Sequence, residues 1–461
     1  MIPPLTIKET HDGLKSKKFS AVELVDSYLA QIKKYNSEYN IFLTVTEEKA
    51  YVTARRLDNL TDKNLPLFGV CTAYKDIFLT EGVRTTAASK VLESYIPQYS
   101  ATVVKRLEEA GTIMLGKLNC DAWAHGASGE NSDFGPTRNP WNKDYVPGGS
   151  SSGSAASLAS NMTLVAMGSD TGGSTRQPAN FCNLVGLKPT RGAISRYGVI
   201  AMSSSIDTVG TFGHTVNDVE AIFNVIKGED GYDGVVTNKK INAKKTNAKY
   251  KLGIAKEYFI DGLDREVEEV INQVRKTYEK IGVEVIEISL PHTKYMVPVY
   301  YIIQPAEVSS NLGRFDGIRY GNDRSYFGEE AKRRIMLGSY VLSAGYYDAY
   351  YLKAQKVRSK IIDDFDKAFT EVDAIISPVS PTPPFKIGAN ADDPLKMYLE
   401  DVYTTSANLA GIPGLAIPST FSKNGLPIGF QLMGPKFSED ILFKLGKMYH
   451  KEIDFKPKTA I

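Results

Sequence analysis

The sequence VPGGSSSGSAASLASNMTLVAMGSDTGGSTR (residues 146–176) is the most informative stretch of this chain. It holds two glycine–serine clusters, at residues 148–153 and 172–174. A helix of small residues at Ala155 to Ala159 and a short apolar run at Leu164 to Met167 join them. Glycine–serine clusters are usually flexible linkers, but packed elements on either side favour a buried, ordered loop here. Because glycine doublets let backbone N–H groups approach a ligand closely, we expect these hydroxyl groups to react with a ligand or bind it.

The length, composition and net charge are those of an ordinary globular protein. The chain has 461 residues, of which 42% are hydrophobic and 23% charged, so it is long enough for a large core. A net charge of +2 is too even to favour nucleic acid or a membrane through charge alone. No apolar run approaches the ~20 residues of a membrane helix, and residues 1–19 lack the apolar segment of a secretory signal. We expect an intracellular protein.

Helix and strand patterns alternate along the chain, which predicts one large α/β domain with a mixed sheet. A capping box at Ser20 to Glu23 starts a helix that we expect to end near Tyr35. The lysine- and asparagine-rich tract at residues 239–251 is interpreted as a solvated loop. Further helices are expected at residues 102–110 and 264–281 and in the tyrosine-rich region 326–372, and strands at residues 67–73, 112–118, 164–167, 252–255, 283–288, 415–418 and 428–433.

Several common chemistries are not supported. The five histidines are scattered without an HExxH or HxH pairing, so a metal enzyme is not indicated; they are His11, His125, His214, His292 and His450. No phosphate-binding G-x-x-x-x-G-K-[ST] motif is present. The cysteines form no CxxC pair and support neither a disulfide framework nor a zinc site; they are Cys71, Cys120 and Cys182. Cys120 or Cys182 could serve as a nucleophile, but a small buried thiol is the commoner case.

Two serine chemistries remain. Residues 149–153 satisfy G-x-S-x-G with Ser151 as the nominal nucleophile, but residues 144–147 do not read as a buried strand and no histidine stands out as the base. We interpret that match as chance. A serine can instead be activated by a lysine whose pKa is lowered by burial. Lys75 ends the mostly apolar run Phe68 to Lys75 and suits that role, although most lysines are solvated surface charges.

The chain resembles the amidase signature family. The family motif runs from a Gly-Gly-Ser-Ser cluster to Asp-x-Gly-Gly-Ser-x-Arg, with Lys-Asp upstream; here these are residues 148–153, 170–176 and 75–76. Ser152 departs from the family, which commonly has glycine there. The resemblance implies a central mixed, twisted sheet covered by helices on both faces. It also implies a single amidase domain over residues 1–461, with an N-terminal helical segment at about 1–60, a catalytic core at about 61–225 and a C-terminal half at about 250–461.

The resemblance also implies the site residues. The triad would be Lys75, Ser150 and Ser174, with a cis peptide bond at Ser150. Lys75 would take a proton from Ser150, and Ser150 the proton of Ser174. The nucleophile is then Ser174, and the oxyanion hole consists of backbone N–H groups of Thr171, Gly172 and Gly173, extending to Ser174.

Residues 126–136, 309–320 and 333–358 resemble one branch of the family, whose members hydrolyse glutamine for a partner that amidates Glu-tRNA(Gln). By position, Tyr300, Arg334 and Asp401 match the residues that hold glutamine in that branch, and the latter half of the chain would complete the glutamine pocket. An arginine suits the carboxylate of a free amino acid and an aspartate suits its ammonium group. The alternative is that Arg334 and Asp401 form an ordinary structural ion pair and that Tyr300 is a core residue.

This branch implies partners rather than a cofactor. No metal or cofactor is expected in this chain; ATP and Mg²⁺ would be used by a B-type partner, a kinase and transamidase that also holds most of the tRNA. A small accessory protein, C-like or the fungal F-like equivalent, would complete the complex. A short connection at residues 321–326 and a composition rich in lysine and asparagine favour a fungal form in the mitochondrial matrix, with a bacterial cytoplasmic form as the alternative. A stand-alone amidase for another small amide and a non-catalytic scaffold protein remain open as functions.

Overall fold

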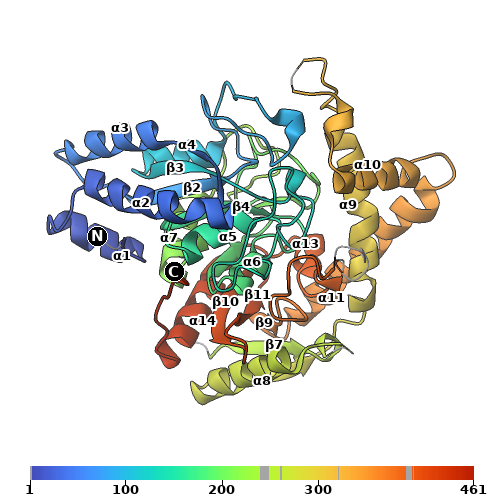
Figure 1. Ribbon diagram of the computed structural model, residues 1–461. Coiled ribbons are helices and arrows are strands. Elements are labelled where there is room, and N and C mark those ends of the chain that lie inside the picture. Colours follow the sequence, from blue (N-terminus) through green and yellow to red (C-terminus); the bar gives the residue numbers. More distant parts are fainter. Residues whose placement is uncertain (1–2, 239–248, 260–261, 320, 391–396, 398) are drawn as a thin grey trace.

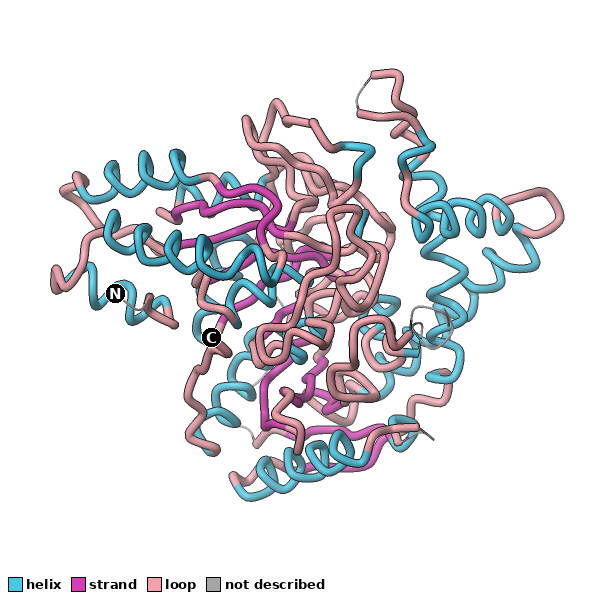
Figure 2. The backbone as a smooth tube through the Cα atoms, viewed as in Figure 1, coloured by secondary structure: helices cyan, strands magenta, loops and turns pink. Residues whose placement is uncertain are grey.

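In the described part of the chain, eleven strands form one mixed sheet at the centre of the protein (Figures 1 and 2). The computed structural model describes residues 3–238, 249–259, 262–319, 321–390, 397 and 399–461. The strand order is β1-β3-β2-β4-β6-β5-β10-β11-β9-β7-β8. The strands are β1 (Phe42–Val45), β2 (Cys71–Lys75), β3 (Ile113–Leu118), β4 (Val165–Asp170), β5 (Val185–Lys188), β6 (Thr208–Gly213), β7 (Lys251–Ala255), β8 (Glu284–Ile288), β9 (Ala374–Ser377), β10 (Gly414–Phe421) and β11 (Pro427–Met433).

Helices cover both faces of the sheet, as predicted. Helices α5 and α6 contact each other, while α4, α7 and α14 form a second set. Helices α5 and α6 contact the same two strands, β5 and β6, as α7 of the second set does. The two sets therefore lie on opposite faces of the sheet. The helices are α1 (Ile7–Lys15), α2 (Ala21–Tyr39), α3 (Glu47–Asp58), α4 (Thr102–Glu109), α5 (Ser152–Ala159), α6 (Arg176–Phe181), α7 (Val216–Ile226), α8 (Arg265–Lys280), α9 (Met296–Leu312), α10 (Glu329–Val341), α11 (Lys353–Ala368), α13 (Thr405–Ala410) and α14 (Glu439–Glu452).

The parallel part of the sheet positions the candidate site. Strand β2 pairs in parallel with both β3 and β4, so the carboxyl ends of β2 and β4 meet at one edge. Lys75 is the last residue of β2, and the second glycine–serine cluster follows the end of β4 at Asp170. Apart from Leu158, helix α5 consists of small residues; all of its residues are buried, and it therefore packs closely on these strands. Its start at Ser152 holds the first cluster over the same edge.

Some sequence predictions need correction. The strand expected at residues 67–73 begins only at Cys71, because residues 66–69 form a turn. Helix α2 continues past Tyr35 to Tyr39, where Asn40 ends it in the left-handed conformation (φ 52°). Strand β1 lies within the N-terminal segment that we expected to be helical and pairs with β3. Residues 239–248 of the predicted loop lie outside the described residues, and its last residue, Lys251, belongs to β7.

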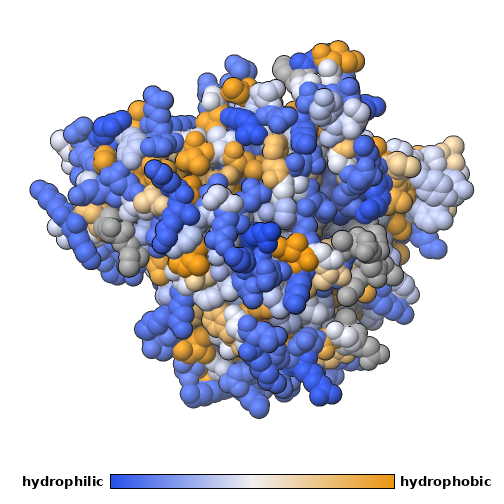
Figure 3. All heavy atoms as spheres, in the orientation of Figure 1, coloured by the Kyte–Doolittle hydropathy of each residue, from blue (hydrophilic) through white to orange (hydrophobic). Residues whose placement is uncertain are grey.

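Helices α9, α10, α11 and α13 pack on one another beside the sheet (Figure 1). The outer side of α10 and the following π-helical turn η6 (Tyr347–Leu352) exposes a cluster of large apolar and aromatic side chains, and Figure 3 shows apolar side chains at the edge of the molecule where Figure 1 places α10. We call this cluster the α10 patch; it comprises Met336, Leu337, Tyr340, Leu342, Tyr346, Tyr347, Tyr350 and Leu352. No helix in the described part of the chain is long and apolar enough to cross a membrane.

Candidate active site

Lys75 is fully buried and is held by hydroxyl groups. Its Nζ lies 2.7 Å from Ser150 Oγ, 3.1 Å from Ser151 Oγ and 3.0 Å from Ser169 Oγ. Burial lowers the pKa of Lys75 to about 8, although carboxylates farther away, among them that of Asp121, oppose the shift. Within the described chain, no carboxylate lies within ion-pair distance of Nζ. A buried amine with a pKa this low can act as a base near neutral pH.

The two glycine–serine clusters contact each other directly. The Gly149–Ser150 peptide bond is cis, and the Ser150 carbonyl accepts a hydrogen bond from Asp121 N–H (3.1 Å). Ser151 N–H donates to the Ser174 carbonyl (3.2 Å). Ser150 is fully buried against Lys75, whereas Ser174 is 7% exposed and its Oγ has no hydrogen-bond partner among the described residues. The three predicted triad residues thus run from the buried Lys75 outward to Ser174.

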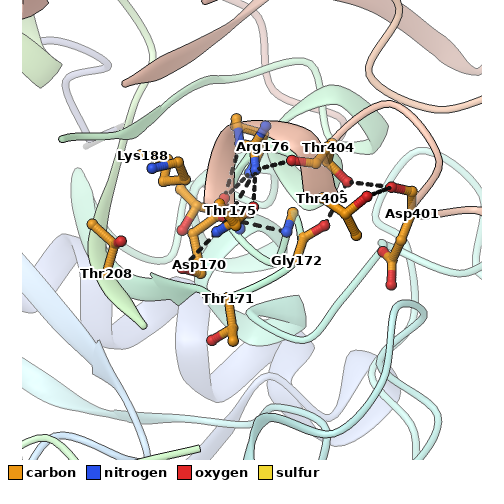
Figure 4. A network of polar contacts seen from close by, with 12 residues as sticks. Asp170, Thr171, Gly172, Thr175, Arg176, Lys188, Thr208, Asp401, Thr404 and Thr405 are labelled. Atoms are coloured by element: carbon orange, nitrogen blue, oxygen red, sulfur yellow. Dashed lines mark hydrogen bonds and ion pairs between the residues drawn. The ribbon is translucent and has the colours of Figure 1, made fainter. Parts of the chain in front are cut away.

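A buried ion pair fixes the loop that carries Ser174 (Figure 4). The Asp170 carboxylate accepts hydrogen bonds from Arg176 Nε (3.1 Å) and Nη2 (3.0 Å), and from the N–H groups of Gly173 (3.0 Å) and Thr175 (3.1 Å). Burial alone would raise the pKa of Asp170, but the charge and hydrogen bonds of Arg176 outweigh it and hold the pKa near 2. Asp170 therefore remains a carboxylate and ties the loop to the start of α6.

The two glycines of this loop are required by close contacts. A methyl group added at Gly172 would lie 2.6 Å from Tyr300 Oη, and one at Gly173 (φ +134°) would clash with Thr404. Thr404 Oγ1 also donates to the Gly172 carbonyl (2.5 Å). Because Gly173 N–H is already engaged by Asp170, the backbone donors without an acceptor in the described chain are those of Thr171, Gly172 and Ser174.

The predicted glutamine-binding residues come from three elements around this loop. Tyr300 lies on α9 and Arg334 on α10, and Asp401 precedes α13; all three are buried. The Tyr301 ring connects the latter two, because the Arg334 guanidinium lies 5.6 Å above it and Tyr301 Oη donates to Asp401 Oδ2 (2.8 Å). The structure therefore brings the three predicted residues together on one side of the Gly172 loop.

Arg334 and Asp401 do not pair with each other. The carboxylate partner of Arg334 is Glu330, which accepts from Nε (2.7 Å), and Gln304 Oε1 accepts from Nη1 (2.9 Å). Nη2 has no acceptor among the described residues. Burial raises the pKa of Asp401 to about 7, although the hydrogen bond from Tyr301 and the charge of Arg334 oppose the shift. The alternative of an Arg334–Asp401 ion pair is therefore wrong.

A cavity of about 240 Å³ lies against the catalytic loops. Its wall includes Ser169 and Thr171, and Asp207, whose Oδ1 accepts from Thr171 Oγ1 (2.7 Å). Tyr300, Arg334 and Asp401 are not among the described residues that line it. The cavity wall thus meets the catalytic loops at Ser169 and Thr171, whereas Tyr300 approaches them at Gly172.

Comparison with known proteins identifies the family. The amidase family model matches residues 23–443. The chain belongs to the amidase family. It is 48% identical, over 98% of each chain, to the A-type component (GatA) of glutamyl-tRNA(Gln) amidotransferase from Carboxydothermus hydrogenoformans. It is 47% identical to the GatA of Koribacter versatilis, over 96% of this chain and 97% of that one. The crystal structure of the Thermotoga maritima GatA, at 40% identity, covers 94% of this chain and 91% of that one with a TM-score of 0.80.

The other residues that the sequence singled out have structural roles in this amidase. Ser151 lies behind Ser150, where its Oγ donates to the Ser169 carbonyl (3.1 Å), and residues 144–147 form no strand. Ser152, where the family commonly has glycine, donates to Thr137 Oγ1 (3.1 Å). Burial raises the pKa of Cys120 to about 12, so its thiol is not activated. Within the described ranges, no group of three or more His, Cys, Asp or Glu side chains could hold a metal ion.

Sequence reasoning missed the residues that support the amidase site. Tyr301 and Gln304 lie beside Tyr300 and one turn after it on α9, and Glu330 precedes Arg334 by four residues on α10. Spacings of three and four place side chains on one helix face, so these partners could have been found from the sequence. Ser169 could not, because its contact with Lys75 depends on the pairing of β2 with β4.

Proposed function

We propose that this chain is the glutamine-hydrolysing component of a glutamyl-tRNA(Gln) amidotransferase. The contact that carries the proposal is Lys75 Nζ at 2.7 Å from Ser150 Oγ, with no carboxylate of the described residues within ion-pair distance of the lysine. The similarity to GatA proteins over 98% of the chain supports the choice of substrate and complex.

In the first half of the reaction, neutral Lys75 accepts the proton of Ser150, and Ser150 accepts that of Ser174. Ser174 Oγ attacks the side-chain amide carbon of glutamine. The N–H groups of Thr171 and Gly172, together with that of Ser174, stabilise the oxyanion that forms, and one such donor contributes about 10²- to 10³-fold in rate. Ser150 returns a proton to the departing nitrogen, which leaves as ammonia. Water then hydrolyses the Ser174 ester, releases glutamate and restores the hydroxyl.

The side chains gathered beside Gly172 are complementary to a free amino acid. The unoccupied Nη2 of Arg334 can donate to the α-carboxylate. Asp401 is a buried carboxyl whose pKa is raised to about 7, so a substrate ammonium group supplies the positive charge that favours its ionised form. Tyr300 Oη lies at Gly172, next to the nucleophile loop.

The released ammonia is used by a partner and not by this chain. The cavity bordered by Thr171, whose described lining does not include Arg334 or Asp401, offers a way out for it. A B-type partner would receive the ammonia, with ATP and Mg²⁺ bound on that partner, and a small accessory protein would complete the complex. The α10 patch supports assembly with a protein partner, since Met336 at its centre is 72% exposed and exposed apolar clusters of this kind mark protein interfaces. The compartment stays a prediction: the short connection at residues 321–326 favours a mitochondrial form, whereas the Carboxydothermus and Koribacter relatives are bacterial.

The deciding experiment measures ammonia release from glutamine by the purified chain alone and by the chain co-expressed with its B-type and accessory partners, with ATP and Glu-tRNA(Gln). We expect release to appear, or to rise sharply, only in the complex. Equal release by the chain alone, or faster turnover of another amide, would establish a stand-alone amidase. If the assembled complex amidates Glu-tRNA(Gln) from added ammonium chloride but does not hydrolyse glutamine, the chain is a non-catalytic scaffold.

A further inference from the structure

Thr171 is anchored differently from the rest of the catalytic loop after β4. Asp170 binds the backbone N–H of Gly173 (3.0 Å), whereas Thr171 is held through its side chain. Thr171 is buried, its side chain points away from the Asp170–Arg176 pair (Figure 4), and its Oγ1 donates to Asp207 Oδ1 (2.7 Å). The proposed mechanism uses the Thr171 N–H and leaves Asp207 without a role.

The Asp207 carboxylate is itself fixed by backbone donors. Met202 N–H donates to Oδ2 (2.9 Å), and Ser203 N–H lies 3.0 Å from Oδ1 and 2.9 Å from Oδ2. Burial raises the pKa of Asp207 to about 6, although the hydrogen bond from Thr171 opposes the shift. The group is therefore ionised in neutral solution and can only accept, so the Thr171 hydroxyl is the donor to a rigidly held, charged oxygen.

The segment that carries Asp207 is tied in turn to helix α9. Ser203 Oγ donates to Glu307 Oε2 (2.6 Å), and Glu307 lies on α9. The same helix carries Tyr300, whose Oη lies 2.6 Å from the position that a methyl group on Gly172 would take. Helix α9 therefore supports the catalytic loop at two neighbouring residues, at one by direct contact and at the other through the Asp207 carboxylate.

Asp218 makes the same side-chain contact away from the site. Its Oδ2 accepts from Thr215 Oγ1 (2.6 Å) and also from Thr215 N–H (3.0 Å), at the start of α7. The two pairs differ in the backbone of the threonine. Thr215 N–H is engaged by its own aspartate, whereas Thr171 N–H has no acceptor in the described chain. Only the Asp207 contact therefore anchors a residue whose backbone donor is available to a ligand.

We propose that Asp207 is a positioning residue that, through the Thr171 hydroxyl, holds the Thr171 N–H in the orientation of an oxyanion donor. This inference rests on the proposed function and adds a residue to it. A fixed Cβ substituent restricts rotation of the backbone to which it is attached, and a donor aimed in advance at the developing oxyanion costs no reorganisation during the reaction. The effect acts on the amide carbon itself, so it should not depend on the rest of the substrate.

The test uses the assembled complex and two substrates: glutamine, and 4-aminobutanamide, which is glutamine without its carboxylate. Thr171→Val keeps the shape of the side chain and removes the hydroxyl group, and Thr171→Ala is a second variant without it. We expect either to lower kcat for glutamine on the order of tenfold, part of the effect of losing a donor outright, with little change in KM. The loss of kcat/KM should be equal for 4-aminobutanamide. Thr171→Ser keeps the hydroxyl and should retain most of the activity.

A double-variant cycle assigns the effect to Asp207. Asp207→Asn replaces the charged acceptor by a neutral amide of the same shape and should lower kcat several-fold. In the Thr171→Val background the same substitution should cause no further loss of kcat, because the hydroxyl that Asp207 holds is already absent. Independent, multiplying losses would show that Asp207 does not act through Thr171.

Thr215→Val is the matched control. It removes the same kind of hydroxyl–carboxylate contact at α7, so it should lower the unfolding midpoint in urea and leave kcat unchanged. An unchanged kcat in Thr171→Val and Thr171→Ala overturns the inference and leaves the proposed function intact. A loss confined to glutamine overturns it as well, because the contact would then serve substrate binding. Absence of glutamine hydrolysis by the wild-type complex would instead refute the proposed function.

Discussion

Lys75 and Lys117 are both fully buried and lie on the adjacent strands β2 and β3, yet their surroundings are opposite. Lys117 Nζ has the Asp76 carboxylate at 3.3 Å and donates to the Phe78 carbonyl (2.7 Å) and Thr85 Oγ1 (2.6 Å). Among the described residues, the hydrogen-bond partners of Lys75 Nζ are all hydroxyl groups. A buried carboxylate favours the ammonium form, whereas hydroxyls accept from the ammonium and donate to the free amine equally well. Burial lowers the pKa of Lys117 as well, but the charge and the hydrogen bond of Asp76 oppose that shift. Lys117 is therefore suited to be a fixed cation, and Lys75 to exchange a proton.

A third buried lysine shows that a low pKa alone does not mark a base. Burial lowers the pKa of Lys188 to about 7, below that of Lys75, but its Nζ contacts only the carbonyl of Pro189 (3.0 Å) among the described residues. Figure 4 shows it beside the Asp170–Arg176 pair and without an interaction with the residues drawn there. What distinguishes Lys75 is the serine hydroxyl at 2.7 Å that leads to the Ser174 loop.

The largest effect should come from the end of the proton path. Ser174→Ala removes the nucleophile, and we expect glutamine hydrolysis by the complex to fall on the order of 10⁴-fold or more. Amidation of Glu-tRNA(Gln) from added ammonium chloride should be retained, because that half-reaction belongs to the partner. Retained glutamine hydrolysis would mean that another residue, with Ser151 as the nearest candidate, is the nucleophile.

The comparison itself is tested by Lys75→Met and Lys117→Met. Lys75→Met should lower kcat by about 10²- to 10⁴-fold, the usual contribution of a general base, with little change in stability. Lys117→Met leaves Asp76 buried without its cation and should cost about 3–5 kcal/mol of unfolding free energy in urea. Activity measured well below the unfolding midpoint should survive in the folded fraction of Lys117→Met. If Lys75→Met were instead the unstable and active variant, the roles of the two lysines would have to be exchanged.

The sequence predicts the strand that ends at Lys75 and the packed helix α5 better than it predicts the contacts of Lys75. The apolar run before Lys75 predicted correctly that the lysine ends a strand, and the small residues of α5 predicted a packed helix. The partners of Lys75 depend on register: Ser169 reaches Nζ only because β4 lies parallel to β2, and that pairing joins segments more than 90 residues apart. Asp401 is similar, because its raised pKa arises from burial in the folded chain, where its partner Tyr301 comes from α9, and no local pattern records this.

Asp401→Asn tests the substrate side of the catalytic loop with a change that keeps shape and the hydrogen bond from Tyr301. It removes the charge proposed to hold the ammonium group, so we expect KM for glutamine to rise about 10- to 100-fold while kcat changes little. Steady-state ammonia release by the complex measures both constants. The control is 4-aminobutanamide, which keeps the ammonium group and should lose as much. A selective loss of kcat would move Asp401 from binding into the proton path.

The smallest expected effect is the pH dependence of glutamine hydrolysis, which also distinguishes the roles of the buried lysines. The neutral amine of Lys75 is the active form, so kcat should rise with pH through the lysine's pKa of about 8, by about tenfold between pH 7 and pH 9. Asp401 acts in the opposite protonation sense, because it must be ionised to bind an ammonium group; kcat/KM should therefore fall further as pH drops through its pKa of about 7. Asp401→Asn should remove that lower inflection and leave the kcat profile in place.

Lys188 also has a pKa of about 7, but Lys188→Met should shift neither inflection, since its Nζ contacts a backbone carbonyl and not a serine. A kcat inflection that disappears in Lys188→Met would break the comparison, because proton exchange would then follow the lower pKa and not the contact with Ser150.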